Sequence, residues 1–136
     1  MLQMLEPPPP DVIKAIADGI SRHNRSESVL REDFAIVKQS KADHLVGGVT
    51  ASVSFAVLFI NNIWVEKAER LRGIGRQLMT AAEDEARKRY AKTACVDTLS
   101  TQAPEFYERL GYVEFGRVEG EVEGRRLDRI WFRKSL

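Results

Sequence analysis

The sequence is poor in cysteine and histidine and has no long hydrophobic run. Cys95 is the single cysteine of 136 residues, so no disulfide within the chain is possible, and its apolar surroundings favour a buried structural thiol over a nucleophile. His23 and His44 lie far apart, without cysteines or carboxylates at metal-binding spacing, so we expect no metal site. No charge-free apolar stretch is long enough to cross a membrane, and there is no basic-then-apolar leader. We therefore expect a cytoplasmic protein with no membrane partner.

An excess of one charge is also lacking. Lysine and arginine number 21 against 20 aspartate and glutamate, which gives a formal net charge of +1. Binding to a nucleic-acid backbone needs concentrated positive charge, so we expect no nucleic-acid partner. A length of 136 residues, with 43% hydrophobic and 30% charged residues, predicts a single globular domain over residues 1–136.

The most informative segment present is residues 70–75, Arg-Leu-Arg-Gly-Ile-Gly, which separates a strand pattern from a helix pattern. Before it, residues 57–65 are rich in β-branched and aromatic side chains, which predicts a mostly buried strand. After it, apolar residues recur three and four apart, which predicts one buried face of a long helix. The predicted buried face comprises Ile74, Leu78, Ala81, Ala82 and Ala86, and the predicted exposed face Arg76, Glu83, Asp84, Arg87 and Lys88.

A basic, glycine-bearing turn that opens a helix is suited to bind phosphate. Glycine lets the backbone approach a ligand, and the first amides of the helix have no intrahelical partner. A nucleoside-triphosphate loop would need lysine and then serine or threonine after Gly75, where this chain has Arg76 and Gln77. A dinucleotide fingerprint would need a third glycine at the position of Leu78. Both interpretations fail, and these six residues alone leave a solvated β-to-α turn as an open alternative.

A second segment, residues 103–112, reads Ala-Pro-Glu-Phe-Tyr-Glu-Arg-Leu-Gly-Tyr. A proline near its start and a glycine near its end are typical of a short helix. Phe106 and Leu110, one turn apart, are expected to face the core, and Tyr107 a different side of the helix. Together, Arg-x-x-Gly-x-Gly and Ala-x-x-Phe-Tyr-x-x-Leu-Gly-Tyr resemble the two conserved blocks of the GNAT N-acetyltransferase superfamily, in the family's order and at a fitting separation.

The resemblance covers nearly the whole chain and implies an α/β (α+β) fold. In this GNAT fold a mixed, mostly antiparallel central sheet is splayed at the cofactor site and carries helices on both faces. A helix at residues 11–23 is expected to turn Val12, Ile13, Ile16, Ala17 and Ile20 inward. Strands are expected at 2–5, 34–37, 45–55, 57–65, 94–99, 112–118 and 126–133, with polar hairpin tips at 38–43 and near 119–123.

The resemblance implies an N-acetyltransferase that uses acetyl-CoA as cosubstrate and no metal. A primary amine of a small-molecule or protein acceptor would attack the thioester directly in a ternary complex. Residues 16–31 and 119–128 are the surfaces expected to choose the acceptor. Family members often pair through their C-terminal strands, which is compatible with a homodimer and leaves the oligomeric state open. The alternative function is a catalytically inactive acyl-CoA-binding regulatory or interaction module.

The resemblance also assigns site residues. Tyr107 falls on the position that commonly protonates the departing CoA sulfur, and a tyrosine of pKa ~10 is protonated at neutral pH. Glu66, acting through water, is the first candidate base, although a solvated charge at a strand end explains it as well; Asp97 is the second. The predicted cofactor-binding residues are Ile63, Trp64, Val65, Arg70, Leu71, Arg72, Gly73, Ile74, Gly75 and Arg76.

Overall fold

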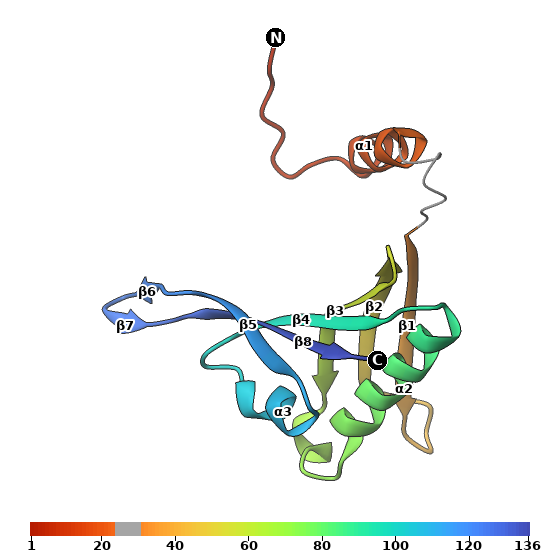
Figure 1. Cartoon of the computed structure of the whole chain (residues 1–136), viewed down its shortest axis with the longest axis vertical. Coiled ribbons are helices and arrows are strands. Elements are labelled where there is room, and N and C mark those ends of the chain that lie inside the picture. Colours follow the sequence, from red (N-terminus) through yellow and green to blue (C-terminus); the bar gives the residue numbers. More distant parts are fainter. Residues whose placement is uncertain (24–30) are drawn as a thin grey trace. The chain divides into compact units, whose positions relative to one another are not determined.

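The computed structural model describes residues 1–23 and 31–136, which form two compact units, Met1–Leu30 and Arg31–Leu136 (Figure 1). The prediction of a single domain over residues 1–136 stays a prediction. The acceptor surface expected at residues 16–31 lies partly outside the described residues.

In the described part of the first unit, residues 1–23, there is one helix, α1 (Pro10–His23), which confirms the helix expected at residues 11–23. Pro10 is suited to the first turn because the amide it lacks would have no helical partner there. None of the α1 residues is buried, so the inward packing of its apolar stripe stays a prediction. The strand expected at residues 2–5 is wrong: this segment is irregular, and no other described part of the unit is extended to pair with it.

The second unit is a six-stranded mixed sheet with two helices, as Figure 1 shows. The sheet has the order β1-β2-β3-β4-β8-β5, and every neighbouring pair is antiparallel except β3 and β4. This arrangement confirms the predicted mixed, mostly antiparallel fold. Its elements are β1 (Glu32–Gln39), β2 (Leu45–Ser54), β3 (Val57–Val65), the 3-10 turn η2 (Lys67–Glu69), α2 (Ile74–Lys88), β4 (Thr93–Leu99), α3 (Pro104–Arg109), β5 (Val113–Val118), the hairpin β6 (Glu121–Val122) and β7 (Arg125–Arg126), and β8 (Arg129–Ser135).

The sheet is splayed at its centre. Strands β3 and β4 pair only from Val57 with Thr93 to Ile60 with Val96, although β3 continues to Val65. A bulge at Asn61 accompanies the separation, because Thr50 of β2 pairs with Asn62 and the next residue of β2 pairs with Ile60. A bulge of this kind bends a strand and redirects its side chains. The backbone edge of the second half of β3 is therefore free of a sheet partner toward β4.

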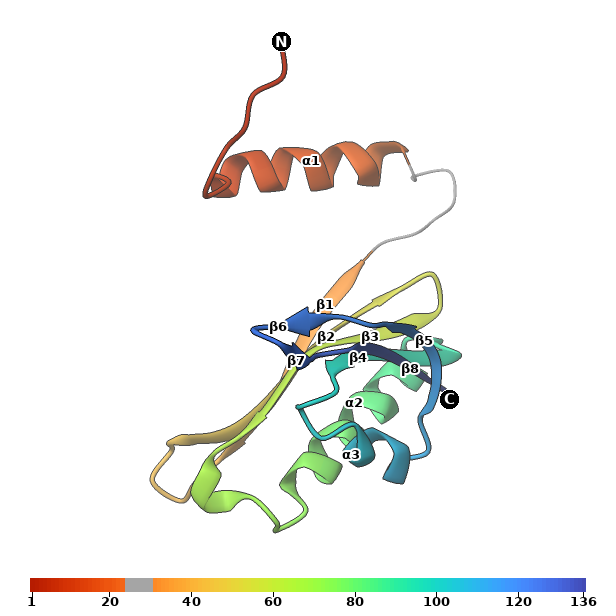
Figure 2. The ribbon, with the colours of Figure 1, turned by 90° about the vertical axis from the view of Figure 1, so that its left-hand side faces the viewer.

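Helices α2 and α3 cover one face of this sheet (Figure 2). The apolar residues of alternate sheet positions point to that face and pack with the buried stripe of α2. Because α1 is not placed relative to this sheet, the helix expected on the opposite face stays a prediction. The buried core includes Val49, Ala51, Leu58, Ile60, Leu78, Met79, Ala82, Ala86, Ala94, Val96, Ile130 and Phe132.

Glu83 of α2 corrects the predicted helix face. It is 4% exposed, although its spacing predicted a place on the solvated side. The Tyr112 hydroxyl donates a hydrogen bond to Glu83 Oε1 (2.9 Å), and Lys134 Nζ lies 2.9 Å from Oε2. A buried carboxylate is tolerated because these partners compensate its desolvation. This cluster ties α2 to β8 and to the end of α3.

The last strand begins three residues later than the predicted Arg126. Asp128 interrupts the extended run: it is 2% exposed, and its carboxylate accepts hydrogen bonds from Arg117 (2.8 Å) and Arg126 (3.1 Å). These hydrogen bonds hold the pKa of Asp128 below its usual value. The Ser100 hydroxyl accepts a hydrogen bond from the Asp128 amide, so this residue anchors the β6–β7 hairpin to the end of β4.

Candidate active site

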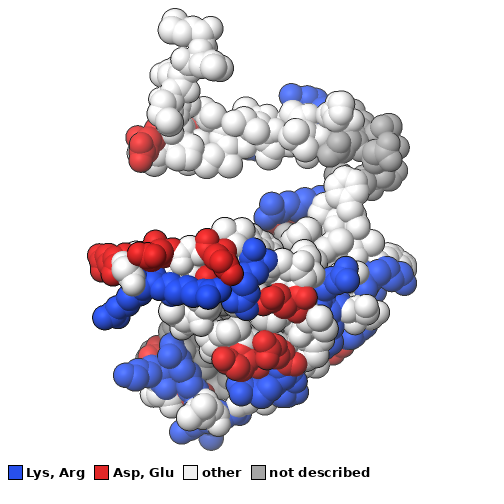
Figure 3. Space-filling model, turned by 60° about the vertical axis from the view of Figure 1, so that its left-hand side comes forward, with Lys and Arg blue, Asp and Glu red and all other residues white. Residues whose placement is uncertain are grey.

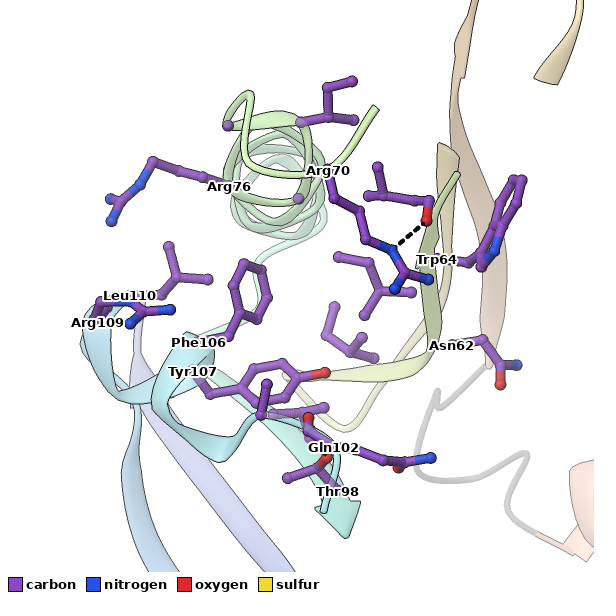
Figure 4. Close-up of a pocket in the computed structure, with 18 of the residues that line it drawn as sticks. Asn62, Trp64, Arg70, Arg76, Thr98, Gln102, Phe106, Tyr107, Arg109 and Leu110 are labelled. Carbon is purple, nitrogen blue, oxygen red and sulfur yellow. Dashed lines mark hydrogen bonds between the residues drawn. The ribbon is translucent and has the colours of Figure 1, made fainter. Parts of the chain in front are cut away.

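A cleft of about 870 Å³ opens where β3 and β4 separate. Its walls come from the second half of β3, the end of β4, the segment between η2 and α2, and helix α3. Figure 4 shows side chains of these elements converging on it. We call the lining residues Arg70, Leu71, Gly73, Ile74, Gly75 and Arg76 the loop end, and Asn61, Asn62, Asp97, Thr98 and Gln102 the polar end.

The loop end presents an uncapped helix terminus. Gly73 is the N-cap of α2, has φ of 78°, and offers no side chain to accept from the first amides of the helix. A Cβ added there would meet no atom within 4 Å, so the space beside this backbone is open. Open amides and the positive end of the helix dipole favour an anion at this point. The structure thus has the features needed for the phosphate binding expected at residues 70–75.

Leu71 has a backbone conformation that is unusual for a residue with a side chain. Its φ is 63°, in the left-handed region that favours glycine, and its side chain is fully exposed. The side chain points away from packing contacts, so the backbone can still face a ligand. The left-handed conformation costs about 1–2 kcal/mol for a residue with a Cβ.

The arginines of the predicted loop have different surroundings. Arg70 Nε donates to the Val65 carbonyl oxygen at 3.0 Å, which ties the loop to the end of β3, as the dashed line in Figure 4 shows. Arg72 pairs with Glu69 at 3.1 Å and is absent from the cleft lining. Arg76 lines the cleft, and Arg109 of α3 joins it there. Sequence reasoning missed Arg109, because only the fold brings α3 beside the loop.

Gly75 brings the two sequence motifs together. A Cβ at this position would lie 3.1 Å from Cζ and 3.2 Å from Cε2 of Phe106, so a side chain would press on that ring. Phe106 in turn packs edge-to-face against Tyr107, with ring centroids 5.1 Å apart. The second glycine of the loop therefore permits the contact that positions α3.

Tyr107 is held by aromatic packing with its hydroxyl in the cleft. The residue is 7% exposed, and its ring packs against Tyr112 and Phe132 at centroid distances of 6.1 and 5.9 Å. Figure 4 shows the hydroxyl directed across the cleft toward β3. Burial raises the pKa of Tyr107, and the negative charge of Asp97 raises it further. The phenol consequently stays protonated at neutral pH and can donate a proton. The sequence predicted that Tyr107 faces a different side of α3 from the core-facing Phe106 and Leu110. This prediction is wrong for the Tyr107 ring, which is part of the core.

The polar end combines exposed side chains, such as Asp97, with the buried Thr98. In β4, Val96 and Thr98 are buried and Asp97 between them is exposed, as strand alternation predicts. Sequence reasoning missed the adjacent Asn61 and Asn62, which the bulge of β3 leaves exposed beside the cleft. Their signal was visible: two asparagines interrupt an otherwise apolar strand.

Three of the remaining predicted site residues line the cleft, and the first candidate base does not. Ile63, Trp64 and Val65 all line the cleft, whereas Glu66 follows the strand, is exposed and is absent from the lining. Cys95 is half-buried in β4, and burial raises the pKa of its thiol, which makes it a poorer nucleophile.

Metal-ligating clusters and membrane-spanning helices are both absent from the described part of the chain. No group of three or more metal-ligating side chains occurs in residues 1–23 and 31–136. No helix within those ranges is long and apolar enough to span a membrane.

A splayed mixed sheet with an uncapped helix start and a buried tyrosine at one cleft is the framework of an acyl-transferring enzyme. The sequence model of the Acetyltransferase (GNAT) family matches residues 3–112. The chain therefore belongs to the GNAT family of acetyltransferases, whose members use acetyl-CoA, and it is an acyltransferase.

Similar proteins agree with this assignment. Acetyltransferase Atu2258 of Agrobacterium fabrum is 29% identical over 125 residues, 90% of each chain. Blasticidin-S acetyltransferase of Streptomyces morookaense is 33% identical over 82 residues, 60% of each chain. A crystal structure of an acetyltransferase from Bacillus cereus ATCC 14579 has a TM-score of 0.79 and 28% identity, and 98% of each chain is covered. A Bacillus anthracis protein in complex with acetyl coenzyme A shares the fold, with a TM-score of 0.68, 19% identity and coverage of 76% of this chain and 62% of that one.

Proposed function

We propose that this protein transfers acetyl from acetyl-CoA directly to a primary amine of a small-molecule or protein acceptor, with both substrates bound together. The observation that carries the proposal is the single cleft shared by the uncapped start of α2 and the Tyr107 hydroxyl. Its volume lies within the range of about 300–1,000 Å³ typical of small-molecule sites. The two similar proteins from Agrobacterium fabrum and Streptomyces morookaense are both named acetyltransferases, which supports the same reaction.

The loop end is proposed to hold the donor. Main-chain amides of residues 71–76 would bind the diphosphate of acetyl-CoA, and Arg76 and Arg109 would add charge from the cleft wall. Arg70 has a second task, because its hydrogen bond to Val65 fixes the loop relative to β3. When bound, acetyl-CoA supplies an acetyl group activated as a thioester.

The second half of β3 and Tyr107 are proposed to serve the reaction itself. Residues 63–65 would offer main-chain amides to the thioester carbonyl, because their edge toward β4 has no strand partner. The amine nitrogen forms a bond to the carbonyl carbon as the carbon–sulfur bond breaks. Tyr107 would donate its proton to the departing sulfur. The amine must also lose a proton, and Glu66 acting through water remains the first predicted base.

Amine-dependent thiol release tests the proposal. Enzyme and acetyl-CoA are mixed with a panel of amines, and free CoA thiol and acetylated product are both measured. We expect equal amounts of thiol and product, and initial-rate plots that intersect because both substrates must be bound together. Binding of acetyl-CoA without stimulation by any amine would favour the inactive acyl-CoA-binding module. Parallel plots with an acetylated enzyme would contradict direct transfer.

A further inference from the structure

Charge is distributed unevenly along the cleft. Three arginines, Arg70, Arg76 and Arg109, line it near the loop and α3, and the one carboxylate there, Glu69, is paired with Arg72. At the polar end, by contrast, the lining contains amides, hydroxyls and one carboxylate, that of Asp97. Figure 4 shows Arg76 and Arg109 on one side of the cleft and Thr98 and Gln102 on another. An anionic donor and a cationic acceptor would each meet a complementary end of such a cleft.

The Asp97 carboxylate is oriented and still accessible. Its Oδ2 lies 2.6 Å from Nη1 of Arg129 in β8, which pairs in register with Leu99, two residues further along β4. The side chain is 41% exposed, and within the described residues Oδ1 has no hydrogen-bond donor. Oδ2 is thus held by the ion pair with Arg129, and Oδ1 can accept a hydrogen bond from a ligand.

Asp97 also lies close to the proposed reaction centre. Both Asp97 and Tyr107 line the cleft, and the Asp97 charge raises the pKa of the Tyr107 hydroxyl. A group bound to Asp97 would therefore lie in the same cleft as the Tyr107 hydroxyl.

We propose that Asp97 binds a positively charged group of the acceptor other than the amine that attacks, so that the preferred substrates are small amines with a second cationic group. This inference rests on the proposed acetyltransferase function and names its substrate class. The second group is the appropriate one, because a carboxylate bound to the attacking ammonium would stabilise its protonated, unreactive form. Arg129 acts as a positioning residue, and its exposed ion pair is weak enough for an acceptor cation to share the carboxylate.

Two amines of the same chain length test this inference. With acetyl-CoA saturating, kcat/KM is measured for 1,5-diaminopentane and for n-pentylamine, which lacks the second charge. A charge-assisted hydrogen bond predicts that the wild-type enzyme prefers the diamine by about tenfold or more. Asp97→Asn should bring the ratio close to one while the KM for acetyl-CoA stays unchanged. Asp84→Asn is the matched control, because Asp84 is an exposed carboxylate paired with Arg87 outside the cleft lining. It should keep the wild-type preference.

Arg129→Gln separates binding from a structural role. It removes the ion pair but keeps the Asp97 charge, so we expect the preference for the diamine to be kept or to increase. Loss of the preference in both Asp97→Asn and Arg129→Gln would mean that the ion pair only supports the sheet. This result would overturn the inference. Equal turnover of the two amines by the wild-type enzyme would overturn the inference and leave the proposed function standing. Acetylation of neither these amines nor any other in the panel would overturn both.

Discussion

The two ends of the cleft are built in different ways. The loop end is one continuous segment whose ligand groups are mainly backbone amides, with arginines around them. The polar end is assembled from single side chains of β3, β4 and the segment before α3. Backbone amides that bind a ligand depend on the conformation of the whole loop. Each side chain of the polar end, by contrast, can be changed by a single substitution. The proposed donor site is thus encoded locally in the sequence, and the proposed acceptor site depends on tertiary structure.

The β6–β7 hairpin differs again from both ends. Glu119, Glu121 and Glu123 lie in the polar hairpin tip predicted near residues 119–123, and Glu119 pairs with Arg126 at 3.0 Å. In the space-filling view acidic and basic side chains lie together on this projecting part (Figure 3). The hairpin therefore lacks the unbalanced charge that would attract a cationic acceptor, which leaves Asp97 as the better candidate.

The largest expected effect lies where the two ends meet, at Tyr107. Tyr107→Phe keeps the aromatic packing but removes the proton donor, so kcat should fall by about 10²–10⁴-fold with little change in acetyl-CoA affinity. Since burial and Asp97 raise the pKa of Tyr107, the wild-type activity attributable to the protonated phenol should persist above pH ~10. At still higher pH the phenol loses its proton, and activity should decline. In Asp97→Asn, which lacks the carboxylate charge, this decline should occur at lower pH. An unchanged kcat in the Phe variant at saturating substrates would remove Tyr107 from the acid role.

The next effect tests whether the loop end binds through its backbone. Gly73→Val fills the open space beside the α2 amides, so acetyl-CoA affinity by calorimetry should fall by about tenfold or more. Gly124→Val in the β6–β7 turn is the matched control, because Gly124 has φ of 74° and a Cβ added there would likewise meet no atom within 4 Å. Both variants should lose similar folding stability. Equal loss of affinity in both, or normal affinity in Gly73→Val, would refute the placement of the diphosphate.

A smaller effect tests the contact between the two motifs. Gly75→Ala gains about 0.5–1 kcal/mol of helix stability but presses on Phe106, and overpacking costs about 1–3 kcal/mol. We expect a loss of about 1 kcal/mol in the free energy of unfolding and a several-fold lower kcat, because the displaced ring adjoins Tyr107. Gly116→Ala is the control, since a Cβ there would come no closer than 3.8 Å to Trp131. A wild-type kcat in Gly75→Ala would show that this contact does not position the tyrosine.

The smallest effect concerns Leu71. Leu71→Gly relieves the left-handed backbone, partly offset by the greater freedom of glycine in the unfolded chain, so the free energy of unfolding should rise by about 0.5–1 kcal/mol. Acetyl-CoA affinity should stay within about twofold, because the leucine side chain is exposed and its backbone is unchanged. A clear loss of stability in urea denaturation would mean that the side chain makes a contact that its exposure does not indicate.

Sequence analysis predicted the loop end more fully than the polar end for a physical reason. The strand at 57–65, the turn and the helix that begins at Ile74 follow from local periodicity and glycine placement, and the structure confirms them. Two predictions depended on tertiary partners and were wrong: residues 2–5 form no strand, and Glu83 is buried by its contacts with Tyr112 and Lys134. Helical spacing cannot reveal a partner supplied by a distant strand.

The splay of β3 and β4 followed from the family resemblance, and the pairing that ends at Ile60 confirms it. The neighbourhood of Asp97 was harder to predict. Strand alternation gave its outward direction, but its pairing with Arg129 depends on the register between β4 and β8. Arg109 lies at the cleft because α3 packs beside the loop, where Gly75 leaves room for Phe106.

A two-substrate kinetic comparison of Gly73→Val and Asp97→Asn tests the separate encoding of the two ends most directly. Acetyl-CoA and 1,5-diaminopentane are varied against each other for the wild type and for both variants. We predict that Gly73→Val raises only the KM for acetyl-CoA and that Asp97→Asn raises only the KM for the diamine. If either variant raised both KM values to the same extent, the division of the cleft into a donor-binding loop end and an acceptor-binding polar end would be contradicted.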